Sequence, residues 1–177
     1  FTSCGDFLDQ ESDRVISADK DRLNAASDTL YSVIGIMNKL QALSDRTILL
    51  GELRGDLSEV QDNASADLRE LANFNISTEN KYNAPRDYYA VINNCNYFLA
   101  KADTMVKNSK NERIFAKEYA AVKAFRAWTY LQLVLNYGKV PLITTPILTK
   151  DDADRQYEMK DIQGICNYFV SDIAPYA

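Results

Sequence analysis

Carboxylates and thiols are the side chains that could carry acid–base or nucleophilic chemistry here, because the 177 residues include no histidine. Without histidine the chain lacks the commonest general base, the usual zinc ligand and any Ser-His-Asp triad. The 25 Asp and Glu residues would allow a glycosidase pair by number alone, but their spacing singles out no two of them. Asp151, Asp152 and Asp154 lack the glycine and distal glutamate of an EF-hand loop, so we expect a solvated acidic loop there. We predict no catalysis, no cofactor and no metal site, and a hydrolase is disfavoured.

The three cysteines, at positions 4, 95 and 166, do not have the spacing of a metal site. Cys95 and Cys166 lie within helical patterns, where a free cysteine usually behaves as a small buried apolar residue. Cys4 follows Phe-Thr-Ser, and a small residue before cysteine is typical of the end of a bacterial lipoprotein signal. These residues leave two alternatives open for Cys4, a lipid attachment site and an ordinary thiol at a frayed terminus.

Two places along the chain are candidates for ligand binding. Asn80 and Tyr82 lie in a polar loop, and an exposed tyrosine beside an amide offers the stacking and hydrogen bonding that sugars need. The alternative is an ordinary surface loop. Arg54 and Asp56 lie next to glycines that allow the backbone to bend sharply, and they are expected to form either a turn with an ion pair or a binding edge.

Apolar residues recur at three- and four-residue steps along most of the chain, which indicates an all-α fold. A briefer pattern (Leu68, Leu71, Phe74) indicates a short helix within 61–80, while 47–53 is either one or two helical turns or a buried extended piece. No convincing strand pair is predicted. Short connections favour antiparallel helix pairs of tetratricopeptide type with long loops. The sequence predicts long helices at 19–42, 84–103, 112–137 and 159–173.

The helix at 112–137 is the expected centre of the fold, because its apolar residues spread around most of its circumference. We therefore place Phe125, Trp128 and Tyr130 in the core. Gly138 is typical of the residue just past a helix C-terminus, and Pro141 prevents the helix from restarting.

Polar residues within the helices are expected to be structural. Asn93, Asn94 and Asn96 are poor helix formers, and the favoured interpretation is an inward-facing amide that bonds the backbone of a neighbouring loop. Ligand contact is the less favoured alternative. Arg126 is likewise expected to be a paired structural arginine rather than a ligand clamp.

The overall composition predicts a folded domain, since 46% of the residues are apolar. A net charge of -5 without a basic cluster weighs against nucleic acid as a partner. No apolar run reaches the length of about 18 residues that a membrane-spanning helix needs. We expect an extended leader at 1–18 and a helical domain at 19–177.

Four segments of the chain are distinctive when taken together: SCGDFLDQES (Ser3 to Ser12), GELRGD (Gly51 to Asp56), YYAVINNCNYFL (Tyr88 to Leu99) and EYAAVKAFRAWTYLQLVLNYGKVPLI (Glu118 to Ile143). These four phrases, in this order and over nearly the whole chain, resemble the SusD/RagB family of outer-membrane nutrient-binding lipoproteins of Bacteroidetes. A proline common in that family soon after Phe-Leu-Asp is absent here, where Gln10, Glu11 and Ser12 stand.

The resemblance implies a lipid anchor on Cys4, exposure at the surface of the outer membrane, and non-catalytic binding of a nutrient, most often a glycan or oligosaccharide. It also implies delivery to a SusC-like TonB-dependent transporter, with this chain as the N-terminal portion of a longer architecture. The alternative is a helical-repeat protein-interaction module with no small-molecule ligand of its own.

Overall fold

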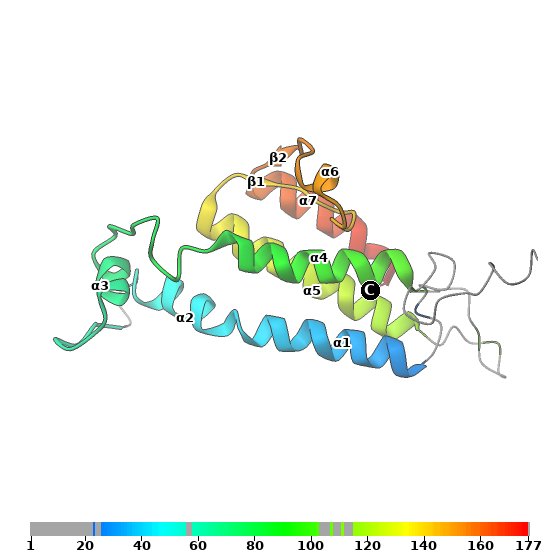
Figure 1. Cartoon of the computed structure of the whole chain (residues 1–177), viewed down its shortest axis with the longest axis horizontal. Helices are drawn as coiled ribbons and strands as arrows, with labels where there is room; N and C mark the ends of the chain where they lie inside the picture. The colour runs from blue at the N-terminus through cyan, green and yellow to red at the C-terminus, as the bar shows by residue number, and fades with distance from the viewer. Residues whose placement is uncertain are drawn as a thin grey trace, which may run out of the picture.

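The computed structural model describes residues 23, 26–55, 58–102, 107, 111 and 115–176, and these form a mostly helical structure (Figure 1). The helices are α1 (Ala26–Gln41), α2 (Ser44–Glu52), α3 (Ala66–Ala72), α4 (Pro85–Lys101), α5 (Ala116–Tyr137), α6 (Lys150–Ala153) and α7 (Ile162–Ile173), followed by a 3-10 turn (Ala174–Tyr176). Two short strands complete the list of elements, β1 (Val140–Pro141) and β2 (Met159–Lys160).

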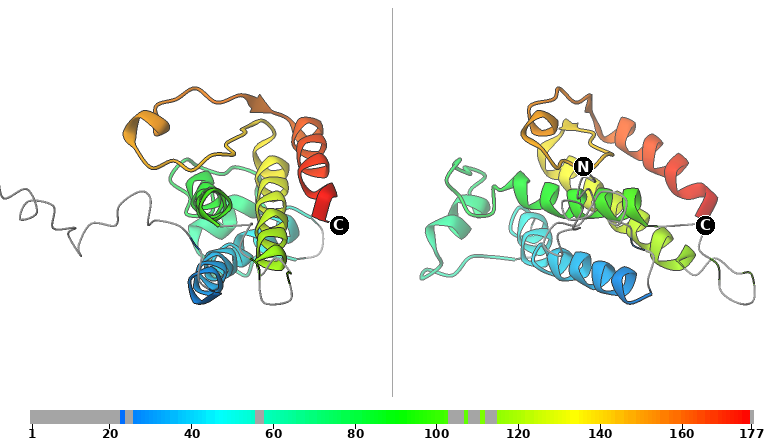
Figure 2. Two further views of the ribbon diagram at one scale, coloured as in Figure 1. Left: turned by 90° about the vertical axis from the view of Figure 1, so that its right-hand side faces the viewer. Right: turned by 45° about the vertical axis from the view of Figure 1, so that its right-hand side comes forward.

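Helices α1, α4, α5 and α7 form a bundle around one main core. α4 and α5 run in opposite directions side by side, α1 packs against both, and α7 packs on the other side of α5, again in the opposite direction (Figures 1 and 2). Buried aromatic and aliphatic side chains from all four helices meet between them, among them Ile36, Tyr88, Phe98, Tyr130 and Ile165. The all-α prediction is therefore confirmed, since the helices carry the core.

The first helix is shorter than predicted. It begins at Ala26 rather than at 19, and residues 19–22 lie outside the described part of the chain. Leu23 instead pairs with Ala102 in an isolated bridge, where its N–H donates to the Lys101 carbonyl over 3.1 Å. In a helix that began at 19, the Leu23 N–H would instead donate to the carbonyl four residues earlier.

The prediction that no strand pair exists is wrong. β1 and β2 pair antiparallel, with Val140 opposite Lys160 and Pro141 opposite Met159. Since Met159 belongs to this pair, the last helix begins at Ile162 and not at 159. Asp161 caps it, because its carboxylate accepts a hydrogen bond of 2.9 Å from the Gly164 N–H.

Most of the other local predictions hold. Pro85 lies in the first turn of α4, and Gly138 follows α5 with a φ of 77°. Residues 47–53 belong largely to α2. The expected acidic loop contains one helical turn, α6, and Thr149 and Asp152 form a capping box at its N-terminus.

Helices α2 and α3 build a second, smaller core at one end of the molecule (Figure 1). Leu50, Leu53 and Leu71 are buried together there, and Tyr82 packs against them. The predicted helix stripe is wrong at Phe74, because α3 ends at Ala72 and the Phe74 ring is 70% exposed.

Trp128 is also not the core residue that the periodicity predicted, since it is 39% exposed on α5. Tyr130 is fully buried and Phe125 is half-buried against the core, as expected. The neighbours of α5 cover most of its circumference, but Trp128, Leu131 and Leu135 remain on the surface. Periodicity identified an apolar stripe without revealing that no described element covers it.

Candidate functional site

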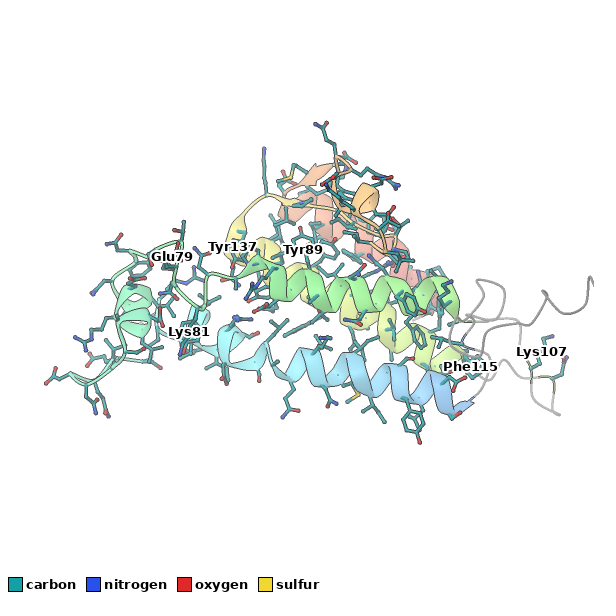
Figure 3. All side chains as sticks on the ribbon, viewed as in Figure 1. Glu79, Lys81, Tyr89, Lys107, Phe115 and Tyr137 are labelled. Atoms are coloured by element: carbon teal, nitrogen blue, oxygen red, sulfur yellow. The ribbon has the colours of Figure 1, made fainter. Side chains whose placement is uncertain are left out.

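The loop between α3 and α4 holds Asn80 and Tyr82, beside the exposed side chains of Glu79 and Lys81 (Figure 3). Asn80 is only 3% exposed. Its amide donates to the Asp67 carbonyl (3.0 Å) and to Glu70 Oε2 (2.9 Å), while its own oxygen accepts from the Tyr82 N–H (3.0 Å). The side chain of Asn80 therefore holds the loop on α3 and is fully used inside the protein.

Glu70 is the second anchor of this loop. Besides the amide of Asn80, its carboxylate accepts the Ser77 hydroxyl (2.8 Å) and the Ser77 N–H (3.1 Å). The hydrogen bond from Asn80, followed by those from Ser77, lowers the pKa of Glu70 against a smaller opposing effect of burial. Asn83 donates to the Ser77 carbonyl (3.1 Å), so the loop is tied at several points.

Tyr82 is half-buried, because its ring packs on the smaller core while Lys81 Nζ lies 4.8 Å from the ring centroid. Arg54 follows the end of α2, and its guanidinium donates to the Leu50 carbonyl of α2 and to Asn136 Oδ1 at the end of α5. It thus joins the two cores. Asp56 and Cys4, the other two candidate residues, lie outside the described residues, and so does any Arg54–Asp56 pair.

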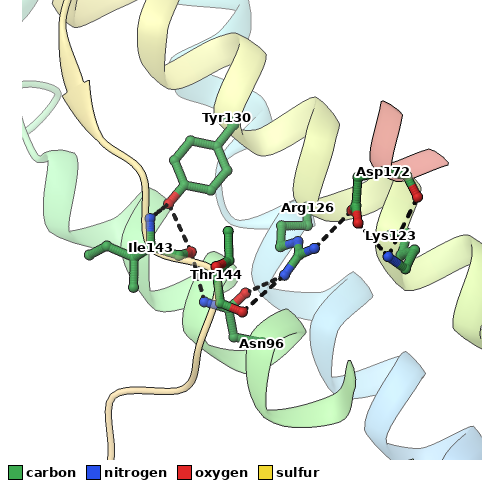
Figure 4. Close-up of polar contacts among 7 residues, drawn as sticks. All are labelled: Asn96, Lys123, Arg126, Tyr130, Ile143, Thr144 and Asp172. Atoms are coloured by element: carbon green, nitrogen blue, oxygen red, sulfur yellow. Dashed lines mark hydrogen bonds and ion pairs between the residues drawn. The ribbon is translucent and has the colours of Figure 1, made fainter. Parts of the chain in front are cut away.

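A buried polar network centred on Arg126 of α5 links three helices of the bundle (Figure 4). Its guanidinium donates to Asn96 Oδ1 (2.8 Å), to the Thr144 carbonyl (3.3 Å) and to Asp172 Oδ2 (2.8 Å). Lys123 pairs with the other oxygen of Asp172. One arginine therefore connects α4, α5, α7 and the segment after β1, and the prediction of a paired structural arginine is confirmed.

Beyond the β1–β2 pair, side chains of α4 and α5 hold the following extended segment, up to Ile147, on the bundle. Asn96 donates to the carbonyls of Ile143 (2.9 Å) and Thr145 (3.1 Å), and Asn93 both donates to and accepts from the backbone of Ile147 (3.0 and 2.7 Å). The favoured interpretation of inward-facing asparagines is thus confirmed for Asn93 and Asn96. Asn94 differs, because it is exposed and its amide donates to the Ala90 carbonyl one turn earlier.

Two tyrosine hydroxyls also form hydrogen bonds with the backbone of β1 and of the segment after it. The Tyr130 hydroxyl accepts from the Ile143 N–H (2.7 Å) and donates to the Ile143 carbonyl (3.0 Å), while the Tyr89 hydroxyl donates to the Pro141 carbonyl (2.8 Å). Burial raises the pKa of both phenols, so they stay neutral donors at any physiological pH.

No protein-family model, curated protein or solved structure matches this chain. Its chemistry therefore has to be judged from its own residues. Within the described ranges, no three Cys, Asp or Glu side chains converge as metal ligands would, and none of the helices there has the length and apolar character needed to cross a membrane.

An apolar hollow lies between α5 and α7, with a volume of about 480 Å³. Trp128 and Leu131 line it from α5, and Cys166, Val170 and Ile173 line it from α7. Cys166 is half-buried, whereas Cys95 is fully buried in the main core, where burial raises the pKa of its thiol to about 12. The sequence analysis placed Trp128 in the core. The signal that could have revealed this surface is the spread of apolar residues around most of the circumference of α5.

Proposed function

We propose that this chain is the helical N-terminal part of a SusD/RagB-type lipoprotein, which binds a glycan or oligosaccharide at the cell surface without chemical conversion. The observation that supports it best is how residues of the quoted phrases contact one another. Arg54 of the second phrase bonds Asn136 of the fourth, and Asn96 of the third bonds both Arg126 and Ile143 of the fourth. Residues of three phrases thus form one framework.

In this proposal α4 and α5 form a helix pair of tetratricopeptide type, and the framework residues keep the pair and its following segment in register. The ligand then contacts the loops rather than the helices. The end that carries α2 and α3 is the candidate region, since Tyr82 offers a half-exposed ring there and the loop that presents it is held rigidly by Asn80 and Glu70.

Cys4 would carry the lipid that anchors the protein in the outer membrane, and the partner would be a SusC-like TonB-dependent transporter. Acyl chains contribute about 0.8 kcal/mol per buried CH₂, so more than one chain on a single cysteine anchors firmly. Neither catalysis nor a cofactor is required, because the ligand is bound and passed on unchanged.

Isolation of the protein from cell membranes tests this proposal. We expect incorporation of radiolabelled palmitate that a Cys4→Ala variant abolishes, co-purification of a β-barrel transporter, and binding to at least one polysaccharide of a defined panel. Absence of a co-purifying barrel, together with no polysaccharide binding, would contradict the proposal.

A helical-repeat interaction module without a small-molecule ligand is the second candidate, and the apolar hollow between α5 and α7 favours it. Trp128, Leu131 and Val170 are exposed there, and contiguous exposed apolar surface is typical of protein contacts. This function predicts a protein partner in the pull-down together with no binding to any member of the polysaccharide panel.

A further inference from the structure

Phe74 occupies a backbone position that does not suit it. Its N–H donates to the Leu71 carbonyl (3.2 Å), and the N–H of Asn75 donates to the Glu70 carbonyl (3.0 Å). This pair of bonds closes the C-terminus of α3 in a motif whose central residue adopts a left-handed conformation and is usually glycine. Phe74 accordingly has a φ of 55°.

Burial of the Phe74 side chain does not offset the strain of this conformation. A side chain with a Cβ is strained in the left-handed region, and a bulky residue there is an outlier. The ring of Phe74 is 70% exposed, so it recovers little of that cost by burial. Glycine would satisfy the same backbone hydrogen bonds without strain. Such outliers are concentrated at functional sites.

Polar, uncharged residues flank Phe74 in the chain. Asn73, Asn75 and Thr78 are exposed, and their side chains form no hydrogen bond with the part of the chain that the structure describes. The turn is also rigid, because Glu70 holds Ser77 and Asn80 against the end of α3. An exposed aromatic residue is thus presented on a backbone turn that is held in place, with exposed amides before and after it in the chain.

We propose that Phe74 is the stacking face for a sugar ring of a neutral glycan, with the amides of Asn73 and Asn75 bonding its hydroxyls. This assignment rests on the proposed glycan-binding function and deepens it. The face of an aromatic ring is electron-rich and receives the C–H groups of a pyranose, while amides both donate to and accept from hydroxyls. A protein partner fits less well, because the centre of a protein interface is a larger continuous apolar patch.

The test measures binding of amylopectin, xylan, mannan and laminarin by affinity electrophoresis, with calorimetry on the polysaccharide that binds. Phe74→Gly is expected to weaken binding at least tenfold while the Tm stays unchanged or rises by about 2 °C, because backbone strain is relieved. Phe74→Trp should keep the affinity within threefold. Tyr31→Ala removes an equally exposed ring (70%) from α1 and should leave the affinity unchanged.

The possible results distinguish failure of the Phe74 site from failure of the proposed function. Wild-type protein that binds none of the four polysaccharides overturns this site, and it overturns the proposed function as well when no β-barrel co-purifies. Wild-type binding that Phe74→Gly leaves intact overturns the site alone. A loss of binding accompanied by a lower Tm overturns the site as well, since Phe74 would then act through folding. The site is also overturned if Phe74→Gly loses a protein partner but still binds the polysaccharide.

Discussion

Arg126 of α5 and Asp172 of α7 form a nearly buried ion pair, with 2.8 Å between Nη2 and Oδ2. The two side chains are 4% and 15% exposed, and Lys123 shares the same carboxylate. On its other side the guanidinium reaches Asn96 of α4. The pair therefore helps to hold α7 on the bundle, because Asp172 is the partner of two cations of α5, Arg126 and Lys123.

Replacing Asp172 with asparagine is expected to lower the free energy of unfolding by about 3 kcal/mol, because it leaves Arg126 and Lys123 largely desolvated without a counter-charge. Urea denaturation followed by circular dichroism measures the change. Asp154→Asn is the matched control, since this exposed carboxylate has no ion pair with the described residues and its loss should change stability by under about 0.5 kcal/mol. Equal effects of the two variants would contradict the role of the pair.

The same pair predicts a pH dependence. Burial alone would raise the pKa of Asp172, but the hydrogen bonds and charges of Lys123 and Arg126 outweigh it and lower the pKa. In the unfolded chain the value returns to about 3.9. The stabilisation is thus fully present above about pH 4 and is lost as the pH falls through the folded-state pKa.

Denaturation at a series of pH values between about 2 and 7 checks this dependence. The stability difference between wild type and Asp172→Asn should be constant near neutral pH and should shrink below about pH 4. The comparison cancels the contributions of Glu70 and Asp152, whose pKa values are also lowered, by hydrogen bonds with Asn80 and Thr149 foremost. A difference that persists unchanged to pH 2 would show that the carboxylate does not need its charge.

Asn96→Ala is expected to destabilise the protein by about 2 kcal/mol, because it removes the side-chain donor of the Thr145 carbonyl and the Asn96 acceptor of the buried Arg126 guanidinium. The Ile143 carbonyl loses one of its two donors and keeps the Tyr130 hydroxyl. Hydrogen exchange should accelerate between 142 and 147 in particular. Asn94→Ala is the control on the same helix, since Asn94 is exposed and alanine is the better helix former. That variant should be as stable as wild type or slightly more stable.

The fluorescence of Trp128, the single tryptophan of the chain, reports on the hollow between α5 and α7. Because the residue is 39% exposed, acrylamide should quench the native emission readily, and Trp128→Gln should cost under about 1 kcal/mol. Truncating a fully buried tryptophan would cost about 3–5 kcal/mol. Native emission that resists acrylamide would place the ring in the core after all.

The sequence by itself determined most of the helices. The recurrence of apolar residues every three or four positions, Pro85 at the start of α4 and Gly138 after α5 are local signals, and the helices form where these signals indicate. The sequence also predicted the inward-facing asparagines of α4, because a buried amide in a helix needs a hydrogen-bond partner nearby.

Only the tertiary structure decided what lies on each side of those helices. Periodicity shows that a face is apolar but not whether another element covers it, so Trp128 and Phe74 were expected in helical stripes and are exposed. The pairing of β1 with β2 and the bond between Arg54 and Asn136, 82 residues apart, join positions that are distant in the chain. Such contacts form only once the helices have packed, because no local pattern specifies which distant groups packing will bring together.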